Sequence, residues 1–256
     1  MRKKRTPPKY LYKYFPDHNT FAADVKLKCQ AALERPYFYC SSVDLFNDPF
    51  ELQLKIETPK GSHDWLHLRQ LFIDEGKPMP SEDAWLEHIK INRAEAENRF
   101  EEQAFLIRRE ARSEARICCF SEVHDSILMW SHYGAKHSGY CLKIDVEKAG
   151  LQDHLIPVLY SKGGDFPKFR VQDIKLEDFR LTFGHKHKGW RYEKEWRFIC
   201  NETDMAYPVE AVESVYYGSE SKEPLQGELR AAFPEATFIQ SKVAQSSYNL
   251  LFSPTE

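Results

Sequence analysis

The sequence lacks any long hydrophobic run, and no stretch approaches the roughly 18 apolar residues that cross a bilayer. We therefore expect no membrane-spanning segment and no membrane partner. A strong excess of either charge is also lacking, since the formal net charge is −3, so nothing draws the whole chain to nucleic acid or anionic lipid. The basic N-terminal stretch MRKKRTPPK is without the apolar core of a signal peptide and is typical of a short solvated tail.

None of the six cysteines forms a C-x-x-C pair, and four of them lie in apolar runs. Without a secretory signal, this favours reduced, mostly buried thiols and a cytoplasmic protein. His185 and His187 have the H-x-H spacing of some metal ligands, but no matching cysteine or acidic partner lies nearby. We therefore expect a helix C-terminus at 185–188 and no bound metal.

The 256 residues are 42% hydrophobic and 14% aromatic, which is enough for a large core. Apolar or alternating segments predict strands at 9–15, 37–42, 115–122, 139–145, 155–161, 195–200, 212–218, 236–242 and 248–252. Outside the charged middle of the chain, helices are predicted at 20–33, 125–135, 171–187 and 221–232. Strands outnumber helices without strict alternation, which predicts an α+β fold with mixed or antiparallel sheets.

The segment 61–115 differs from the rest because it is charged and amphipathic. Ser81 is placed as a helix N-cap. The apolar residues that keep helical phase are Trp85, Ile89, Ala96, Phe100 and Ile107. We therefore predict a single domain over 1–256, in which 9–60 and 115–256 form the α+β body and 61–115 forms a helical insertion, with its charges on a solvated face.

Two glutamates one residue apart stand in GWRYEKEWRFIC (189–200). If this segment is a strand, Glu193 and Glu195 share one face, because strand side chains alternate. Like charges on one face repel, so the face is either wet or part of a site. Arg191 and Arg197 would lie on the same face, and the four charges could neutralise one another.

Four stretches resemble, in order, the bacterial family named domain of unknown function 2971. They are LYKYF (11–15), YFYCSSVDLFNDPFE (37–51), CFSEVHDSILMWSHYGAKHSGYCLKID (119–145) and KGWRYEKEWRF (188–198). They cover most of the chain outside 60–115. The family name implies no activity.

The order of elements is also similar to an ADP-ribosyltransferase fold, and EKEWR (193–197) resembles the E-x-E motif of that superfamily. The resemblance implies that Glu195 takes the place of the catalytic glutamate and Glu193 that of the upstream one. Lys13, in the first strand with Tyr12, stands where the superfamily usually has a histidine or arginine that contacts NAD.

The implied reaction cleaves the N-glycosidic bond of NAD, and a carboxylate stabilises the ribosyl cation that forms. A second carboxylate could deprotonate the incoming nucleophile. Contacts to the cofactor are expected from Tyr12, Lys13, Ser41, Asn47, Asp48, Trp130, His132, Tyr133, Trp190 and Arg197. The resemblance thus implies NAD as a substrate, no metal, and an unknown protein or nucleic-acid acceptor, as for a toxin or phage-defence effector.

Simpler explanations stay open for these residues. Trp130 could be a core residue and Gly134 the cap of its helix, although His132 or Tyr133 could still face a cleft. FNDPFE (46–51) could be only a conformationally required turn, because asparagine and aspartate bond their own backbone.

Two other functions also stay open. The first is a metal-dependent nuclease that uses Asp48, Glu193 and Glu195 with Lys194 or Lys188, although the ordered D…E-x-K run is absent. The second is a non-catalytic binding or scaffold module.

Overall fold

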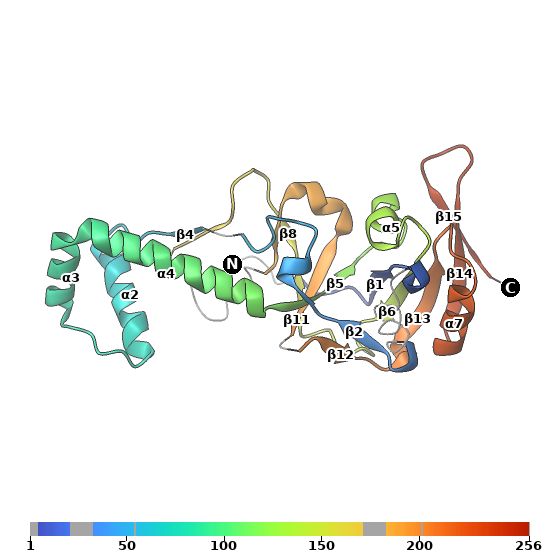
Figure 1. The fold of residues 1–256 in the computed structure, drawn as a ribbon, viewed down its shortest axis with the longest axis horizontal. Coiled ribbons are helices and arrows are strands. Elements are labelled where there is room, and N and C mark those ends of the chain that lie inside the picture. The colour runs from blue at the N-terminus through green and yellow to red at the C-terminus, as the bar shows by residue number, and fades with distance from the viewer. Residues whose placement is uncertain (1–4, 21–32, 54, 171–182, 201, 256) are drawn as a thin grey trace. The chain divides into compact units, whose positions relative to one another are not determined.

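The computed structural model describes residues 5–20, 33–53, 55–170, 183–200 and 202–255, and it divides into two compact units (Figure 1). Unit 1 comprises Met1–Ser41, Arg116–Tyr160 and Lys188–Glu256, and unit 2 comprises Ser42–Ala115 and Ser161–His187. The chain combines helices with a mixed sheet, which confirms the α+β class. In the described part of the chain, no helix is both long and apolar enough to cross a membrane.

Unit 1 is built on one large sheet. Its strand order is β15 (Leu250–Pro254), β14 (Thr237–Val243), β13 (Val212–Tyr217), β6 (Tyr140–Asp145), β1 (Tyr10–Phe15), β5 (Arg116–Ser121), β11 (Glu195–Cys200) and β7 (Leu155–Pro157). Neighbours along this path are antiparallel, except that β13 and β14 are parallel and joined through helix α7 (Leu225–Ala232). Three of the four stretches that resemble a family therefore meet in the adjacent strands β6, β1, β5 and β11.

The two faces of this sheet carry separate apolar clusters, as strand alternation requires. On β1, Leu11 packs into the larger cluster, whereas Tyr14 packs into the smaller one with Met129 and Trp130 of helix α5 (Ile127–Tyr133). α5 thus covers the face that carries Tyr14.

Shorter elements complete unit 1. A two-stranded sheet pairs β2 (Tyr37–Tyr39) with β12 (Asp204–Ala206). The remaining elements among the described residues of unit 1 are η1 (His18–Thr20), β8 (Leu159–Tyr160), the 3-10 helix η4 (Lys188–Glu193) and η5 (Val209–Ala211). Strand β3 (Ser41–Ser42) includes the last residue of the first segment of unit 1 and the first residue of unit 2.

Unit 2 is mainly helical, as the charged middle of the chain predicts. Its helices are α2 (Ser62–Asp74), α3 (Glu82–Ile91) and α4 (Arg93–Glu114), and it also holds η2 (Val43–Leu45), β10 (His185–Lys186) and the parallel pair of β4 (Lys55–Glu57) with β9 (Lys168–Arg170). Ser81 caps α3 as expected, with its hydroxyl accepting from the Ala84 N–H. Ile107 is an exception to the predicted apolar phase, because its side chain is 47% exposed.

Two predicted helices fall largely outside the described residues, namely those at 20–33 and 171–187. The end of the second is described, and there the helix C-terminus expected at 185–188 is wrong. His185–Lys186 form β10, and Lys188 already begins η4.

The expectation that every thiol is reduced is also wrong, because Cys40 and Cys200 form a disulfide. They are 160 residues apart in sequence, so no local pattern could reveal the pair. The pairing of β2 with β12 brings them together: the Cys40 N–H donates to the Thr203 carbonyl, just beyond the end of β11.

Cys118, Cys119 and Cys141 are free, and burial raises the pKa of each thiol above its usual value. Since the thiolate is the reactive form, we expect these cysteines to react with iodoacetamide at pH 8 at least about tenfold more slowly in the native protein than in denaturant. Peptide mass mapping measures this. Rapid labelling of Cys141 in the native protein would contradict this expectation. Cys40 and Cys200 should be labelled only after their disulfide has been reduced.

Candidate functional site

The two glutamates of the E-x-E stretch lie in different backbone conformations. Glu193 ends the 3-10 helix η4, Lys194 has a left-handed φ of 44°, and only Glu195 begins strand β11. The prediction that 191, 193, 195 and 197 share one strand face is therefore wrong. Its physical reason is Lys194, whose left-handed backbone breaks the alternation on which the prediction depended.

Glu195 and Arg197 form a buried ion pair on one face of β11. Arg197 Nε donates to Glu195 Oε1 at 2.7 Å, and Nη2 donates to Oε2 at 3.1 Å. The side chains are 4% and 0% exposed. This two-point contact fixes the carboxylate in position and balances its charge. The neutralising arrangement that the sequence left open is thus present for this pair.

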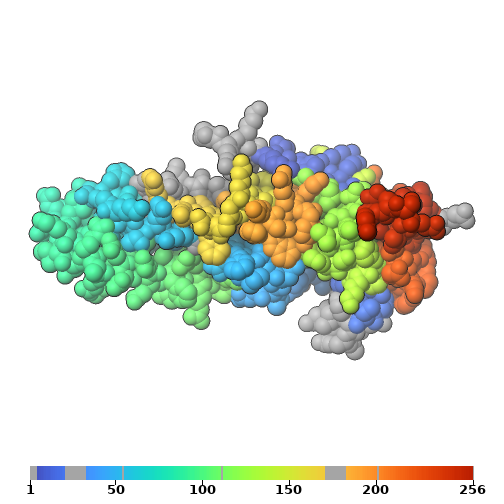
Figure 2. All heavy atoms as spheres, turned by 90° about the horizontal axis from the view of Figure 1, so that it is seen from above, coloured from blue at the N-terminus to red at the C-terminus, as the bar shows by residue number. Residues whose placement is uncertain are grey.

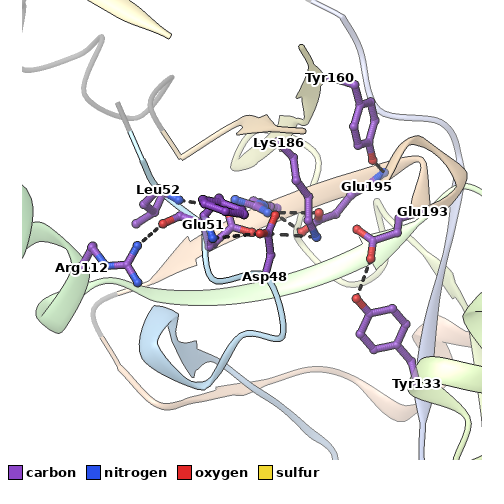
Figure 3. A network of polar contacts seen from close by, with 11 residues as sticks. Asp48, Glu51, Leu52, Arg112, Tyr133, Tyr160, Lys186, Glu193 and Glu195 are labelled. Atoms are coloured by element: carbon purple, nitrogen blue, oxygen red, sulfur yellow. Dashed lines mark hydrogen bonds and ion pairs between the residues drawn. The ribbon is translucent and has the colours of Figure 1, made fainter. Parts of the chain in front are cut away.

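Glu193 is buried too, and its partner comes from α5. The Tyr133 hydroxyl donates to Glu193 Oε1 at 2.5 Å, and Figure 3 shows the phenol pointing at the carboxylate. Two residues expected at the site from separate parts of the sequence are therefore brought into contact.

The backbone around the two glutamates is held at three points. Ser121 Oγ donates to the Glu193 carbonyl at 2.6 Å, and the Glu122 N–H donates to the Lys194 carbonyl at 3.1 Å. The Glu195 N–H donates to the Tyr160 hydroxyl at 2.8 Å, a contact visible in Figure 3. This anchoring stabilises the left-handed Lys194 and sets the positions of both carboxylates.

An aromatic group lies next to this polar network. His132 has ring centroids 6.4 Å from Trp190 and 6.0 Å from Tyr192, and those two rings are 6.1 Å apart. His132 Nδ1 is 3.0 Å from the Tyr192 hydroxyl. Tyr133 connects the two parts of the site, because its ring is 6.3 Å from that of His132 while its hydroxyl binds Glu193.

Trp130 does not belong to this aromatic group. It is fully buried, packs edge-on against Tyr14 at 5.2 Å, and donates its indole N–H to the His124 carbonyl. The expectation that Trp130 contacts the cofactor is therefore wrong, because its side chain is fully enclosed in the core. The simpler explanation is confirmed, since Gly134 caps α5 with its N–H donating to the Trp130 carbonyl.

The two candidates on β1 lie on opposite faces of the sheet. Tyr12 and Glu195 are both in register with Ser121, so they share a face. Lys13 lies on the other face, where its ammonium group is 5.4 Å from the centre of the Phe120 ring and donates to the Cys119 carbonyl. Tyr12, not Lys13, is on the same side as Glu195.

Three further candidates belong to other parts of the fold. Ser41 is in β3, whereas the exposed Asn47 and the buried Asp48 lie in unit 2. Asp48 Oδ1 accepts from the Phe50 N–H at 2.9 Å, as the turn interpretation predicts.

Unit 2 also contains a buried charged pair that no sequence pattern selects. Glu51 is 1% exposed, its Oε2 is 3.9 Å from Lys186 Nζ, and its Oε1 accepts from the Leu52 N–H. Glu51 follows the recognised turn, but its partner lies 135 residues later (186 − 51). Tyr160 and Tyr192 in unit 1 were missed for the same reason.

Metal chemistry has no ready ligand set in the described residues, where no three histidine, cysteine, aspartate or glutamate side chains gather closely enough to hold an ion. Asp48 of the nuclease hypothesis belongs to unit 2, and Glu193 and Glu195 belong to unit 1.

Burial lowers the pKa of two histidines near the site, His124 and His137. At His124, the negative charge of Asp125 partly offsets this lowering of the pKa, whereas the positive charge of Lys143 adds to it. At His137, the negative charge of Glu220 partly offsets it. At pH values near and below 6.5, the ordinary pKa of histidine, the folded protein therefore binds fewer protons than the unfolded chain. Their contribution to stability is therefore complete above pH 6.5 and is lost as the pH falls.

We expect the thermal unfolding midpoint of the wild type to decrease as the pH is lowered from 7.5 to 5.5. The decrease should be smaller in the double variant His124→Phe with His137→Asn. Phenylalanine keeps the ring that packs on Tyr12 and Tyr216, and asparagine tolerates the φ of 70° at position 137. Thermal unfolding across this range measures the effect. An identical pH slope in the double variant would contradict the assignment.

Residues 129–198 match the family model described as "Protein of unknown function (DUF2971)". The match begins in α5, ends in β11 and includes Tyr133, Glu193 and Glu195. No curated protein and no solved structure matches the chain. Over these residues, which are 70 of the 256 in the chain, the sequence is similar to the DUF2971 family of proteins of unknown function.

Proposed function

We propose that unit 1 is an ADP-ribosyltransferase-like enzyme, which cleaves NAD and transfers ADP-ribose to a protein or nucleic-acid acceptor. The observation that carries the proposal is the pair of buried carboxylates at Glu193 and Glu195, each held by its own donor next to an aromatic group. Two fixed carboxylates of different environment suit a reaction that builds positive charge and also moves a proton.

Each carboxylate has one role in this reaction. Glu195, held by Arg197, stabilises the ribosyl cation as the bond from C1′ to the nicotinamide nitrogen breaks and that nitrogen keeps the electron pair. Glu193 accepts the proton of the acceptor nucleophile as its lone pair forms the new bond to C1′. Neutral nicotinamide leaves, and ADP-ribose is attached to the acceptor.

The aromatic group supports NAD as the substrate, because the nicotinamide ring of NAD is cationic. Aromatic faces attract cations, and Trp190 and Tyr192 are half-buried side chains with His132 beside them. When the glycosidic bond breaks, the ring becomes neutral and this attraction weakens, which helps nicotinamide to leave.

Thermal unfolding with and without millimolar NAD, followed by an assay for released nicotinamide, tests the proposal on the wild type and on Glu193→Gln and Tyr133→Phe. NAD at a hundred times its dissociation constant should stabilise the wild type by about 2.7 kcal/mol. Glu193→Gln should keep this stabilisation and lose nicotinamide release by about 10²-fold or more. The rate of nicotinamide release by Tyr133→Phe should lie between those of the wild type and Glu193→Gln, since this variant removes only the hydrogen bond to Glu193.

Glu213→Gln is the matched control, because this exposed residue of β13 undergoes the same chemical change outside the site. If NAD moves no midpoint and no nicotinamide is released, the E-x-E resemblance is superficial. A stabilising effect of divalent metal instead would favour the nuclease, and no effect of either ligand would favour a binding or scaffold module.

A further inference from the structure

Helix α4 of unit 2 carries three consecutive apolar side chains that face solvent. Phe105, Leu106 and Ile107 are 56%, 49% and 47% exposed. A run of exposed apolar residues in a helix is costly in water and indicates a contact surface. Part of the α4 surface is visible as green spheres in Figure 2.

The same helix packs inward through a different stripe. Ala96, Phe100, Ala104 and Arg108, at intervals of four residues, are half-buried or buried. At 100° per residue, Phe105 and Leu106 lie on either side of a line that runs nearly opposite to this stripe. Phe105 and Leu106 are thus not the edge of the internal packing surface, whereas Ile107 points in the direction of the inner stripe.

Charged residues flank the apolar pair on this outer face. Glu102 and Arg109 follow the same line, three residues before Phe105 and three residues after Leu106. Both are exposed, and within the described chain neither has an ion-pair partner. They cannot pair with each other, because seven residues separate them by about 10 Å along the helix.

This arrangement is complementary to itself when reversed. In an antiparallel pair of α4 helices with a two-fold axis between Phe105 and Leu106, the two Phe105 side chains meet on one side of the seam and the two Leu106 side chains meet on the other. Glu102 then lies opposite Arg109 of the second copy, and the symmetry forms this ion pair twice. An apolar centre flanked by opposite charges is typical of helix–helix seams.

We propose that the outer face of α4 is a homodimer interface, in which two copies pair antiparallel through Phe105, Leu106, Glu102 and Arg109. A membrane surface suits the face less well, because acidic residues slightly outnumber basic ones in α4. The inference is independent of the proposed enzyme activity.

A charge swap on the full-length chain tests the interface by sedimentation velocity over a range of concentrations. The wild type should show a monomer–dimer equilibrium. Glu102→Arg places arginine opposite Arg109, and Arg109→Glu places glutamate opposite Glu102, so each alone should weaken dimerisation at least about tenfold. The double variant Glu102→Arg with Arg109→Glu restores both pairs in reversed order and should dimerise like the wild type.

Glu110→Arg changes the net charge as Glu102→Arg does but lies away from the seam, and it should leave dimerisation unchanged. Circular dichroism confirms folding, which changes at these exposed positions should not disturb. A wild type that stays monomeric at about 100 μM would overturn the proposal, as would a dimer that both single variants leave intact. Failure of the double variant to recover would also exclude this pairing.

Discussion

Replacing Glu195 with alanine is expected to lower the free energy of unfolding by about 3–5 kcal/mol, because it removes one partner of a buried ion pair. Arg197 is fully buried, and its guanidinium would lose both hydrogen bonds to the carboxylate. A desolvated charge is costly to the fold when part of its compensation is removed. Urea unfolding followed by circular dichroism measures the loss.

The double variant Glu195→Leu with Arg197→Met is expected to recover at least half of that loss. Apolar side chains of similar volume remove both charges from the interior, and such replacements of buried pairs are often neutral or stabilising. The coupling between the two positions is read from a double-mutant cycle whose single variants are Glu195→Leu and Arg197→Met. A double variant no more stable than Glu195→Ala would show that Arg197 is held mainly by other groups.

The same variants separate a structural role of Glu195 from a catalytic one. If the pair only stabilises the fold, a stable double variant should release nicotinamide at the rate of the wild type. If Glu195 stabilises the ribosyl cation, the double variant should be folded and inactive. For this reason Glu195→Gln alone is a poor test, because loss of activity could follow from loss of stability.

Alternation of apolar residues located most of the sheet of unit 1. The segments expected as strands at 115–122, 139–145 and 212–218 correspond to β5, β6 and β13. Each has one or both faces in the core, so the pattern reflects burial directly. The strand prediction was wrong for the residues just before β11, because a 3-10 helix and the left-handed residue Lys194 interrupt the alternation. Lysine has no preference for that backbone conformation that the sequence could reveal.

The candidate site was predictable in its composition and not in its contacts. Glu193, Glu195 and Tyr133 were selected from the sequence, but the bond from Tyr133 to Glu193 joins residues 60 positions apart. Tyr160 contacts the backbone of Glu195, and a contact of this kind makes no demand on residue type that a pattern could reveal. Such long-range contacts depend on strand order, which local periodicity does not specify.

Two glycines near α5 lie where the main chain of another segment comes close. A Cβ on Gly218 would lie 2.0 Å from the His137 carbonyl oxygen, and one on Gly139 would lie 2.1 Å from the Phe15 carbonyl oxygen. In both cases the clashing atom is main chain, so no rotamer change relieves it. Gly218→Ala and Gly139→Ala are each expected to destabilise the protein by at least about 3 kcal/mol.

Gly227→Ala is the matched control within the same unit, since it lies inside helix α7. Its Cβ would lie 2.9 Å from Glu223 Oε2, the far end of a flexible side chain that can move. Alanine gains up to about 1 kcal/mol in helix propensity over glycine. This gain offsets the loss of the hydrogen bond that the Gly227 N–H donates to the Glu223 carboxylate. Its stability should therefore stay within about 1 kcal/mol of the wild type in urea unfolding. Equal stability of all three variants would mean that the backbone at 137–139 moves away from Gly218 at little cost, and that the strained left-handed residues 135–137 are not fixed by this contact.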